Sequence, residues 1–246
     1  MKKILITGSS KGLGLEIGKF LMKEGHQIVL NGRYQASLSK LRKDFKNVKY
    51  VRGDFSKPNE SKKVIKETIK ILGKLDGIVC NIGNSNSCKP GNENYNEWIK
   101  IFNQNFFATT NAIESSKKHL LKSKGSIICI SSICGNEFIK NAPITYSTAK
   151  AALNFYAKSL SHYLGPKGVK INIISPGNLL FNGSVWQKKM MKNPKIIKKM
   201  IKNNVPMNTF IDSDEISNLV SYLFSNKSKY TNGAIFTVDG GQTIKL

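Results

Sequence analysis

The sequence predicts an α/β fold with a doubly wound parallel sheet, built as a single domain over residues 1–246. Short β-branched apolar runs alternate along the whole chain with segments whose apolar residues recur at helical spacing, the pattern of a sheet covered by helices on both faces. A chain of 246 residues, 40% of them apolar, is long enough for one sizeable core and short for two full domains.

The first thirty residues contain a complete strand–turn–helix–strand unit. Residues 4–7 form a β-branched run that ends in the glycine-rich turn GSSKGLG at 8–14. Apolar residues then recur at helical spacing until Gly25, and residues 27–30 give a second strand. This is the nucleotide-binding unit of a Rossmann fold, whose turn amides and positive helix end meet a pyrophosphate. Taken alone, a glycine cluster is explained about as well by a tight turn.

The same alternation continues to the end of the chain. Further strands are expected at 48–52, 77–81, 126–131, 169–174 and 234–238, with helices around 62–72, 95–116, 145–164 and 214–224. One Lys-rich segment, 178–210, breaks the rhythm; it is helical in pattern near 186–201 and contains Pro194 and Pro206. Because it is too long for an ordinary loop, we expect a lid or substrate-binding excursion within the domain.

A net charge of +24, from 39 basic and 15 acidic residues, raises the question of a polyanionic partner. Only Arg33, Arg42 and Arg52 are arginines, whereas nucleic-acid readers favour Arg for bidentate contacts to phosphate and guanine. The sequence also has no recognition helix or aromatic–basic RNA motif. Nucleic-acid binding is therefore the weaker reading, and the excess of Lys fits a coding bias toward A and T.

The cysteines and the N-terminus predict an ordinary intracellular chain. Cys80, Cys88, Cys129 and Cys134 show no C-x-x-C pairing, so neither a zinc site nor a disulfide framework follows. The apolar run near the N-terminus ends at Thr7, and no run is long enough to cross a bilayer. We expect a cytoplasmic protein with reduced thiols, no metal and no membrane partner.

Tyr146 and Lys150 are four residues apart on a predicted helix, so both lie on one face. There the Lys150 ammonium is expected to lower the pKa of the Tyr146 phenol toward the range of an acid/base catalyst. Without further context such a pair is more often a solvated helix face.

Short motifs spaced along the chain provide that context. In order they are TGSSKGLG at 7–14, Asp54, NIG at 81–83, Asn105, Ser131 and Ser132, YSTAK at 146–150, SPG at 175–177 and VDGG at 238–241. In order and spacing they resemble the short-chain dehydrogenase/reductase family, and within it members like the 3-oxoacyl-[acyl-carrier-protein] reductases. The resemblance covers essentially the whole chain. It implies an oxidoreductase that moves a hydride between a nicotinamide and a carbonyl or secondary alcohol.

The resemblance also implies site residues. Tyr146 would be the general acid or base at the substrate oxygen, and Ser132 would hold and polarise that oxygen. Lys150 would bind the nicotinamide ribose and depress the Tyr146 pKa, while Asn105 would support a water chain. The implied cofactor-binding positions are Gly8, Ser10, Lys11, Gly12, Leu13, Arg33, Asp54, Phe55, Asn81, Gly83, Tyr146, Lys150, Pro176, Gly177 and Leu179.

The cofactor preference rests on charge at the end of the second strand. An acidic side chain there would bind the ribose 2′-hydroxyl of NAD and repel a 2′-phosphate, but the sequence reads Asn31-Gly32-Arg33. Arg33 is suited to pair with a phosphate, and Lys11 lies where many NADP-using relatives carry a basic residue. We therefore expect NADP(H) to be favoured over NAD(H).

The substrate is indicated only by charge. Between Glu137 and Asp212 lie twelve lysines and no acidic residue. An electropositive mouth would suit an anionic substrate, such as a phosphorylated or nucleotide-linked sugar, a coenzyme A thioester or an acidic carrier protein; a solvated Lys-rich helix explains the pattern equally well. Phe181 departs from the family pattern, which often has Thr five residues after the proline, at a place expected to meet the nicotinamide carboxamide.

Two other function classes stay open. A cofactor-binding scaffold or sensor would bind the dinucleotide without turnover, and a nucleic-acid binder would lose affinity steeply with salt. The intact set of Asn105, Ser132, Tyr146 and Lys150 argues against the first of these. The resemblance further implies a homo-oligomer, a tetramer or dimer, built partly through the helices that carry Asn105 and Tyr146.

Overall fold

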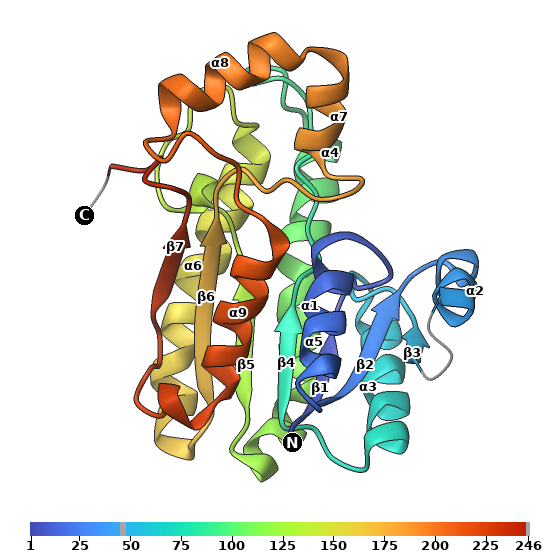
Figure 1. Cartoon of the computed structure of the whole chain (residues 1–246). Helices are drawn as coiled ribbons and strands as arrows, with labels where there is room; N and C mark the ends of the chain where they lie inside the picture. The colour runs from blue at the N-terminus through green and yellow to red at the C-terminus, as the bar shows by residue number, and fades with distance from the viewer. Residues whose placement is uncertain (45–47, 245–246) are drawn as a thin grey trace.

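The computed structural model describes residues 1–44 and 48–244, which form a seven-stranded sheet. All neighbouring strands are parallel, in the order β3-β2-β1-β4-β5-β6-β7, so their carboxyl ends lie together at the upper edge of the sheet in Figure 1. The strands are β1 (Lys3–Ile6), β2 (Gln27–Gly32), β3 (Lys49–Arg52), β4 (Gly77–Cys80), β5 (Ser126–Ile130), β6 (Lys170–Pro176) and β7 (Ile235–Val238). The predicted doubly wound sheet is confirmed, and each strand end falls within two residues of its predicted place.

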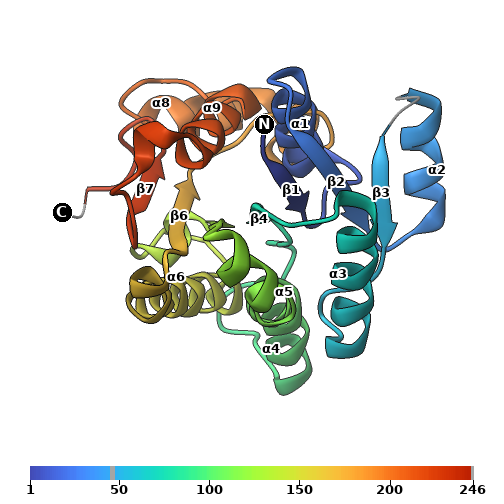
Figure 2. The same cartoon turned by 90° about the horizontal axis from the view of Figure 1, so that it is seen from below.

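Helices cover both faces of the sheet (Figure 2). On one face lie α1 (Gly12–Lys23) and α9 (Ser213–Phe224); on the other lie α3 (Pro58–Leu72), α5 (Ala108–Ser123) and α6 (Ile144–Leu164), with α4 (Tyr95–Phe102) against α6 and α2 (Gln35–Asp44) beside the β3 edge. The remaining helices are α7 (Val185–Lys192) and α8 (Pro194–Asn204), with a π-helical turn η1 (Asn103–Phe107) and 3-10 turns η2 (Ile133–Gly135), η3 (Gly165–Lys167) and η4 (Asn226–Ser228). None of the helices in the described ranges is long and apolar enough to cross a membrane.

The central strands are continuous apolar runs because the sheet is buried on both faces. In β1, Ile4, Leu5 and Ile6 are all fully buried. Leu5 joins the apolar cluster under α3, α5 and α6, whereas Ile4 and Ile6 join the cluster under α1 and α9. The two clusters pack on opposite faces of the sheet and hold it in place. The loops that leave its carboxyl edge therefore start from fixed positions.

The helices differ from the sequence prediction in two places. Helix α2 was not predicted, because its sequence is mostly polar and offers few apolar residues to define a periodic face; Leu41 is buried against the sheet. The helix expected over 95–116 is divided into α4, the π turn and α5. A single π turn inserts one residue into the helical winding, which a short apolar pattern does not reveal.

The segment predicted as an excursion, 178–210, lies above the carboxyl ends of the strands (Figure 1); we call it the α7–α8 segment. Pro194 separates its two helices, as the sequence suggested. The chain leaves and re-enters the domain through a parallel bridge between Leu179 and Ile211. The amide of Leu180 donates to the Ile211 carbonyl at 2.9 Å, and the Ile211 amide donates to Asn178 at 3.0 Å. The two ends of the segment are therefore fixed to each other.

Candidate active site

The chain order of the strands reverses between β1 and β4. In open α/β sheets, the crevice above such a reversal is where ligands bind. The turn after β1, the loop after β4 and the start of α6 meet at this crevice, since Gly8 lies against Ile82 and Gly83 lies against Lys150. The sequence-predicted site residues from these three elements are thus brought to one place.

The glycine turn after β1 is held by Asn31 of β2. The amide of Gly8 donates to Asn31 Oδ1 at 3.2 Å, and the amide of Ser9 donates to the Asn31 carbonyl at 2.7 Å. Gly8 and Gly12 have φ values of +60° and +62°, a left-handed conformation that glycine adopts without strain. The turn is therefore fixed in shape by glycines and by a bond to the neighbouring strand.

The amides at the start of α1 are open. Lys11 caps the helix in an extended conformation without a side-chain bond, and the first turn carries no acidic residue. Within the described ranges, the amides of residues 11–13 donate to no protein acceptor. Unpaired amides at the positive end of a helix suit an anion, so the turn fits the pyrophosphate of a dinucleotide. The sequence-predicted positions on it are Gly8, Ser10, Lys11, Gly12 and Leu13.

The loop after β4 lies between this turn and the catalytic residues. Asn81 Nδ2 donates to the carbonyl of Gly8 at 3.1 Å, which ties the loop to the turn. A Cβ added at Gly83 would lie 3.1 Å from both Asn105 Oδ1 and Lys150 Nζ. Glycine at 83 thus lets the loop pass close to two polar side chains, and Asn81 and Gly83 both line the crevice.

Asn105 is fully buried inside the π turn. Its Nδ2 donates to the carbonyls of Ile101 and Asn84, both at 3.0 Å, and its Oδ1 accepts from the Asn84 amide at 2.9 Å. The side chain therefore fixes the loop after β4 from below. Asn105 lies within the π turn, whose widened winding sets the direction of its side chain toward Asn84. Such turns are frequent at functional sites.

Ser132, Tyr146 and Lys150 come together above β5. The Ser132 hydroxyl lies close enough to that of Tyr146 to influence its titration. Lys150 Nζ lies 5.8 Å from the centre of the Tyr146 ring and donates to the Ile130 carbonyl at 2.9 Å. A phenol, a hydroxyl and an ammonium thus share one wall of the crevice, the arrangement needed to hold an oxygen and exchange a proton with it.

Burial is the largest cause of the pKa shifts of Tyr146 and Lys150. It raises the pKa of Tyr146 above its usual range; the Cys134 thiol raises it further, and the Ser132 hydroxyl lowers it in part. Burial lowers the pKa of Lys150 to about 8. The expectation that Lys150 brings the Tyr146 pKa down is corrected here. The net shift is upward, because burial outweighs the effect of Ser132 and the ammonium is directed at the Ile130 carbonyl.

Cys134 is a site residue that the sequence reasoning missed. Its amide donates to Ser132 Oγ at 3.2 Å, and the Ser132 and Ser147 side chains lie close enough to its thiol to lower the thiol pKa in part. Burial raises the pKa of this thiol. The cysteine spacing indicates neither a metal site nor a disulfide. The feature of the sequence that places Cys134 near the site is its position two residues after Ser132. Across residues 1–44 and 48–244, no three His, Cys, Asp or Glu side chains gather as a metal site would require.

The residues expected at the adenine end lie at the carboxyl ends of β2 and β3. Arg33 is half-exposed, and its Nη1 lies 3.6 Å from Asp54 Oδ2. The two expected contacts are thus ion-paired with each other. Phe55 is fully buried in the core, and its carbonyl accepts a bond from Asn111 at 2.9 Å. The Phe55 side chain therefore does not reach the crevice.

The residues after β6 close the other side of the crevice. Pro176 ends the strand, and the Gly177 amide donates to the Val238 carbonyl at 2.9 Å. A Cβ at Gly177 would lie 2.8 Å from that of Asp239, so the close approach requires glycine. Leu179 then enters the bridge at the base of the α7–α8 segment.

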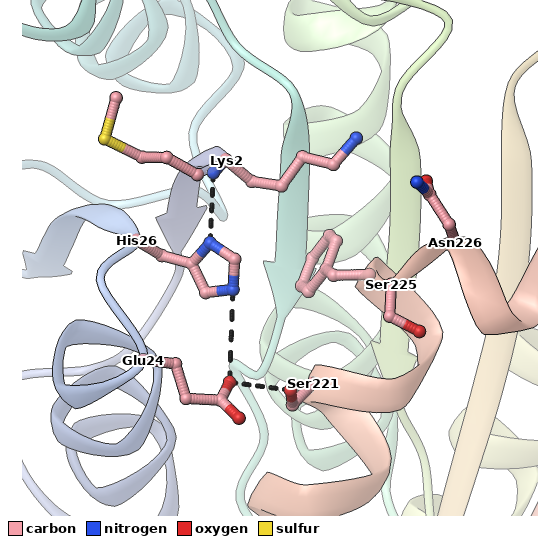
Figure 3. A pocket seen from close by; sticks show the side chains of 8 residues that line it. Lys2, Glu24, His26, Ser221, Ser225 and Asn226 are labelled. Carbon is pink, nitrogen blue, oxygen red and sulfur yellow. Dashed lines mark hydrogen bonds and ion pairs between the residues drawn. The ribbon is translucent and has the colours of Figure 1, made fainter.

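A hollow at the opposite, amino end of the strands is separate from this crevice (Figure 3). His26 Nδ1 accepts from the Lys2 amide at 3.0 Å, and Glu24 Oε2 accepts from Ser221 Oγ at 2.6 Å. Burial lowers the pKa of His26. None of the sequence-predicted site residues lines this hollow.

Comparison with known proteins gives matches along the whole chain. The model of the family described as "Enoyl-(Acyl carrier protein) reductase" matches residues 8–243. Glucose 1-dehydrogenase 2 of Bacillus subtilis is 27% identical over 99% of this chain and 95% of that protein. A diacetyl reductase of Staphylococcus epidermidis is 29% identical over 98% of each.

Among solved structures, L-sorbose reductase from Gluconobacter frateurii, complexed with NADPH and L-sorbose, superposes with a TM-score of 0.90 at 25% identity, covering 100% of this chain and 98% of that one. Fold, motif order and sequence matches over nearly the full length agree with one another. The chain therefore belongs to the short-chain dehydrogenase/reductase family of oxidoreductases.

Proposed function

We propose that this oxidoreductase uses NADP(H) to interconvert a carbonyl compound and a secondary alcohol, with Tyr146 as general acid and base. The observation that carries the proposal is the gathering of Ser132, Tyr146 and Lys150 at the carboxyl end of β5, with the loop after β4 joining them to the open glycine turn. The nicotinamide would supply or accept the hydride.

The side chains divide the remaining work. Tyr146 gives a proton to the substrate oxygen during reduction and takes it back during oxidation. The raised pKa of Tyr146 keeps the phenol protonated at neutral pH, which is the form that donates. Ser132 holds the same oxygen by its hydroxyl. Lys150, with a pKa of about 8, is largely charged at pH 7 and lies next to the ring.

The glycine turn would hold the pyrophosphate, and Arg33 with Lys11 would hold the 2′-phosphate. The structure places no carboxylate at the end of β2, although Asp54 from the end of β3 pairs with Arg33. A phosphate carries more charge than one carboxylate and offers a guanidinium two parallel bonds, so it competes well for Arg33. The complex of L-sorbose reductase with NADPH is consistent with this preference.

The test is a titration of the purified protein with NADPH and with NADH, followed by nicotinamide fluorescence at moderate salt. NADPH should bind more tightly, and Arg33→Asp should weaken NADPH binding by about 10-fold or more, because a charge-assisted bond is worth about 1.5–3 kcal/mol. An unchanged preference in the variant would place the 2′-phosphate elsewhere. Binding of neither nucleotide would reject the proposal, and binding without turnover on any carbonyl would indicate a scaffold or sensor.

We further propose that the α7–α8 segment is a lid and that it favours an anionic substrate. Its seven lysines, 188, 189, 192, 195, 198, 199 and 202, are all exposed, and in the described part of the chain none forms an ion pair. Unneutralised charge above the crevice attracts anions over a Debye length, about 8–10 Å at physiological salt. A matched neutral and phosphorylated substrate pair tests this; equal activity with no salt dependence would refute it.

We also propose a homo-oligomer that pairs through α5 and α6. Large apolar side chains stand exposed on α6 and at the end of the π turn that precedes α5: Phe107 at 42%, Phe155 at 77% and Tyr163 at 74%. Large exposed aromatic side chains of this kind are suited to an interaction surface, and burying them would favour association. Sedimentation velocity should give a dimer or tetramer, and Phe155→Glu should shift it toward the monomer; a monomeric wild type would exclude the proposal.

A further inference from the structure

The glycine turn is covered by an aromatic side chain from the α7–α8 segment. A Cβ added at Gly12 would lie 3.0 Å from Cε2 of Phe181, with two further ring atoms within 4 Å. The ring of Phe181 therefore rests on the face of Gly12 that carries no side chain. This contact joins the turn after β1 to a segment more than 160 residues later in the chain.

The ring is held in this place by its own backbone and by packing. The Phe181 amide donates to Ser184 Oγ at 3.3 Å, and the Ser184 amide donates to the Phe181 carbonyl at 2.9 Å. Ser184 is buried and caps α7. The side chain packs against the apolar cluster that contains Leu13 and Ile211. Phe181 is thus tied to the corner where the α7–α8 segment begins, so a movement of one carries the other.

The covered glycine belongs to the turn that the proposed cofactor needs. In a dinucleotide-binding turn, a glycine allows the backbone to approach the pyrophosphate, since a side chain would keep the phosphates away. At Gly12 that approach is taken up by the Phe181 ring, while the neighbouring amides of residues 11–13 have no protein acceptor. A ring in van der Waals contact and a pyrophosphate cannot share one face.

We infer that Phe181 gates the cofactor crevice: binding of the dinucleotide displaces its ring from Gly12 and moves the start of the α7–α8 segment with it. This inference rests on the proposed NADP(H) function. Because Phe181 is bonded to the cap of α7, the displacement passes directly to the helices that stand above the substrate position. Cofactor occupancy and the position of the proposed lid are thereby coupled.

The rate of NADPH association separates a gate from a direct contact. If the ring covers Gly12 in about nine molecules of ten, Phe181→Ala should raise the association rate and the affinity by about tenfold, with dissociation unchanged. Stopped-flow nicotinamide fluorescence measures both rates. Phe181→Leu, which keeps an apolar side chain of smaller reach, should fall between the two and serves if the alanine variant does not fold.

Phe210→Ala is the matched control. Phe210 belongs to the same segment and packs on Trp186 with ring centres 5.9 Å apart. Its replacement by Ala therefore loosens the segment and leaves the contact at Gly12 unchanged. We expect it to leave the NADPH association rate within twofold of wild type. In a Trp98→Phe background, Trp186 of α7 also reports movement: its emission maximum should shift on NADP⁺ binding.

Three results would overturn the gate. They are an unchanged association rate in Phe181→Ala, a faster dissociation in that variant, which indicates a ring stacked on bound cofactor, and an equal acceleration in Phe210→Ala. If wild type and Phe181→Ala both fail to bind NADPH and NADH, the proposed function itself fails, and that outcome is distinct from the other three.

Discussion

The floor of the crevice and the α7–α8 segment above it are built in opposite ways. In the floor, Asn105 and Lys150 are buried, and each is bonded to backbone carbonyls of neighbouring loops or strands. In the segment, the only buried residue of the two helices is Ile201, and the lysines face solvent. The floor therefore has one arrangement, whereas the segment is held at its base.

In the proposed function, this difference separates the chemistry from substrate recognition. Groups that exchange a proton with a substrate must be positioned to within fractions of an ångström, and buried bonds to backbone supply that precision. A surface that selects substrates by charge needs no such precision, and its lysines act through a field that salt screens. Substitutions in the two regions should consequently differ in size and in their dependence on salt.

The largest effect is expected from the floor. Tyr146→Phe removes only the hydroxyl that exchanges the proton, so turnover of a carbonyl substrate with NADPH should fall by about 10³-fold, within the usual range for a general acid. NADPH affinity should stay within twofold. Tyr230→Phe, where the side chain is 90% exposed, is the control and should be silent. Substantial residual turnover in Tyr146→Phe would reject its role as the acid.

Lys150 gives a prediction in pH. Below pH 8 its ammonium is buried in the folded chain at a cost; between about 8 and 10.5 the folded state releases the proton while the unfolded state keeps it. Stability should therefore rise over this window, relative to Lys150→Met, by about 3 kcal/mol, since one pKa unit corresponds to about 1.4 kcal/mol.

Urea unfolding of both proteins across this pH range measures the difference. Lys158→Met removes an exposed lysine of the same helix and should give a profile parallel to wild type. A difference between Lys150→Met and wild type that stays flat with pH would contradict the buried-charge account.

A smaller loss is expected where α1 passes the loop after β4. A Cβ at Gly14 would lie 2.4 Å from Asn81 Nδ2 and 2.9 Å from the Gly8 carbonyl, so Gly14→Ala should destabilise the protein by about 2 kcal/mol through overpacking. At Gly18 of the same helix the nearest atom is the end of the Leu30 side chain at 2.7 Å, which is free to rotate away. Gly18→Ala should therefore cost less; equal losses by urea unfolding would contradict this.

The smallest effect is expected from the segment. Replacing Lys195, Lys198, Lys199 and Lys202 of α8 by Glu should lower kcat/KM for an anionic substrate by a few-fold, and high salt should abolish the difference. The matched control reverses Lys62, Lys63, Lys66 and Lys70, four exposed lysines of α3, with the same change in net charge. Equal effects of the two sets would show that only the total charge matters.

The sequence predicted most of the fold because its signals are local. Each β-branched run became a strand, and the parallel order followed from the alternation with helices. Helix α2 was missed, since a polar helix at a sheet edge has almost no apolar period. The π turn was missed because one extra residue leaves the apolar spacing on either side intact.

For the candidate site, spacing predicted which side chains share an element, and it did not predict their electrostatics. Tyr146 and Lys150 were placed on one helix face by spacing alone, as the structure shows. The upward shift of the Tyr146 pKa depends on burial and on Cys134, which arrive from other elements of the fold. The contact of Phe181 with Gly12 likewise joins distant parts of the chain, so no local pattern contained it.

The bridge between Leu179 and Ile211 has a consequence for how such a chain changes over generations. The polypeptide enters and leaves the α7–α8 segment at one point, through bonds of 2.9 and 3.0 Å between residues 178–180 and 211. An insertion, deletion or wholesale exchange between those anchors would leave the strand register untouched. If the segment selects the substrate as proposed, exchange of this stretch would change the substrate range while the sheet and its strand register stay the same.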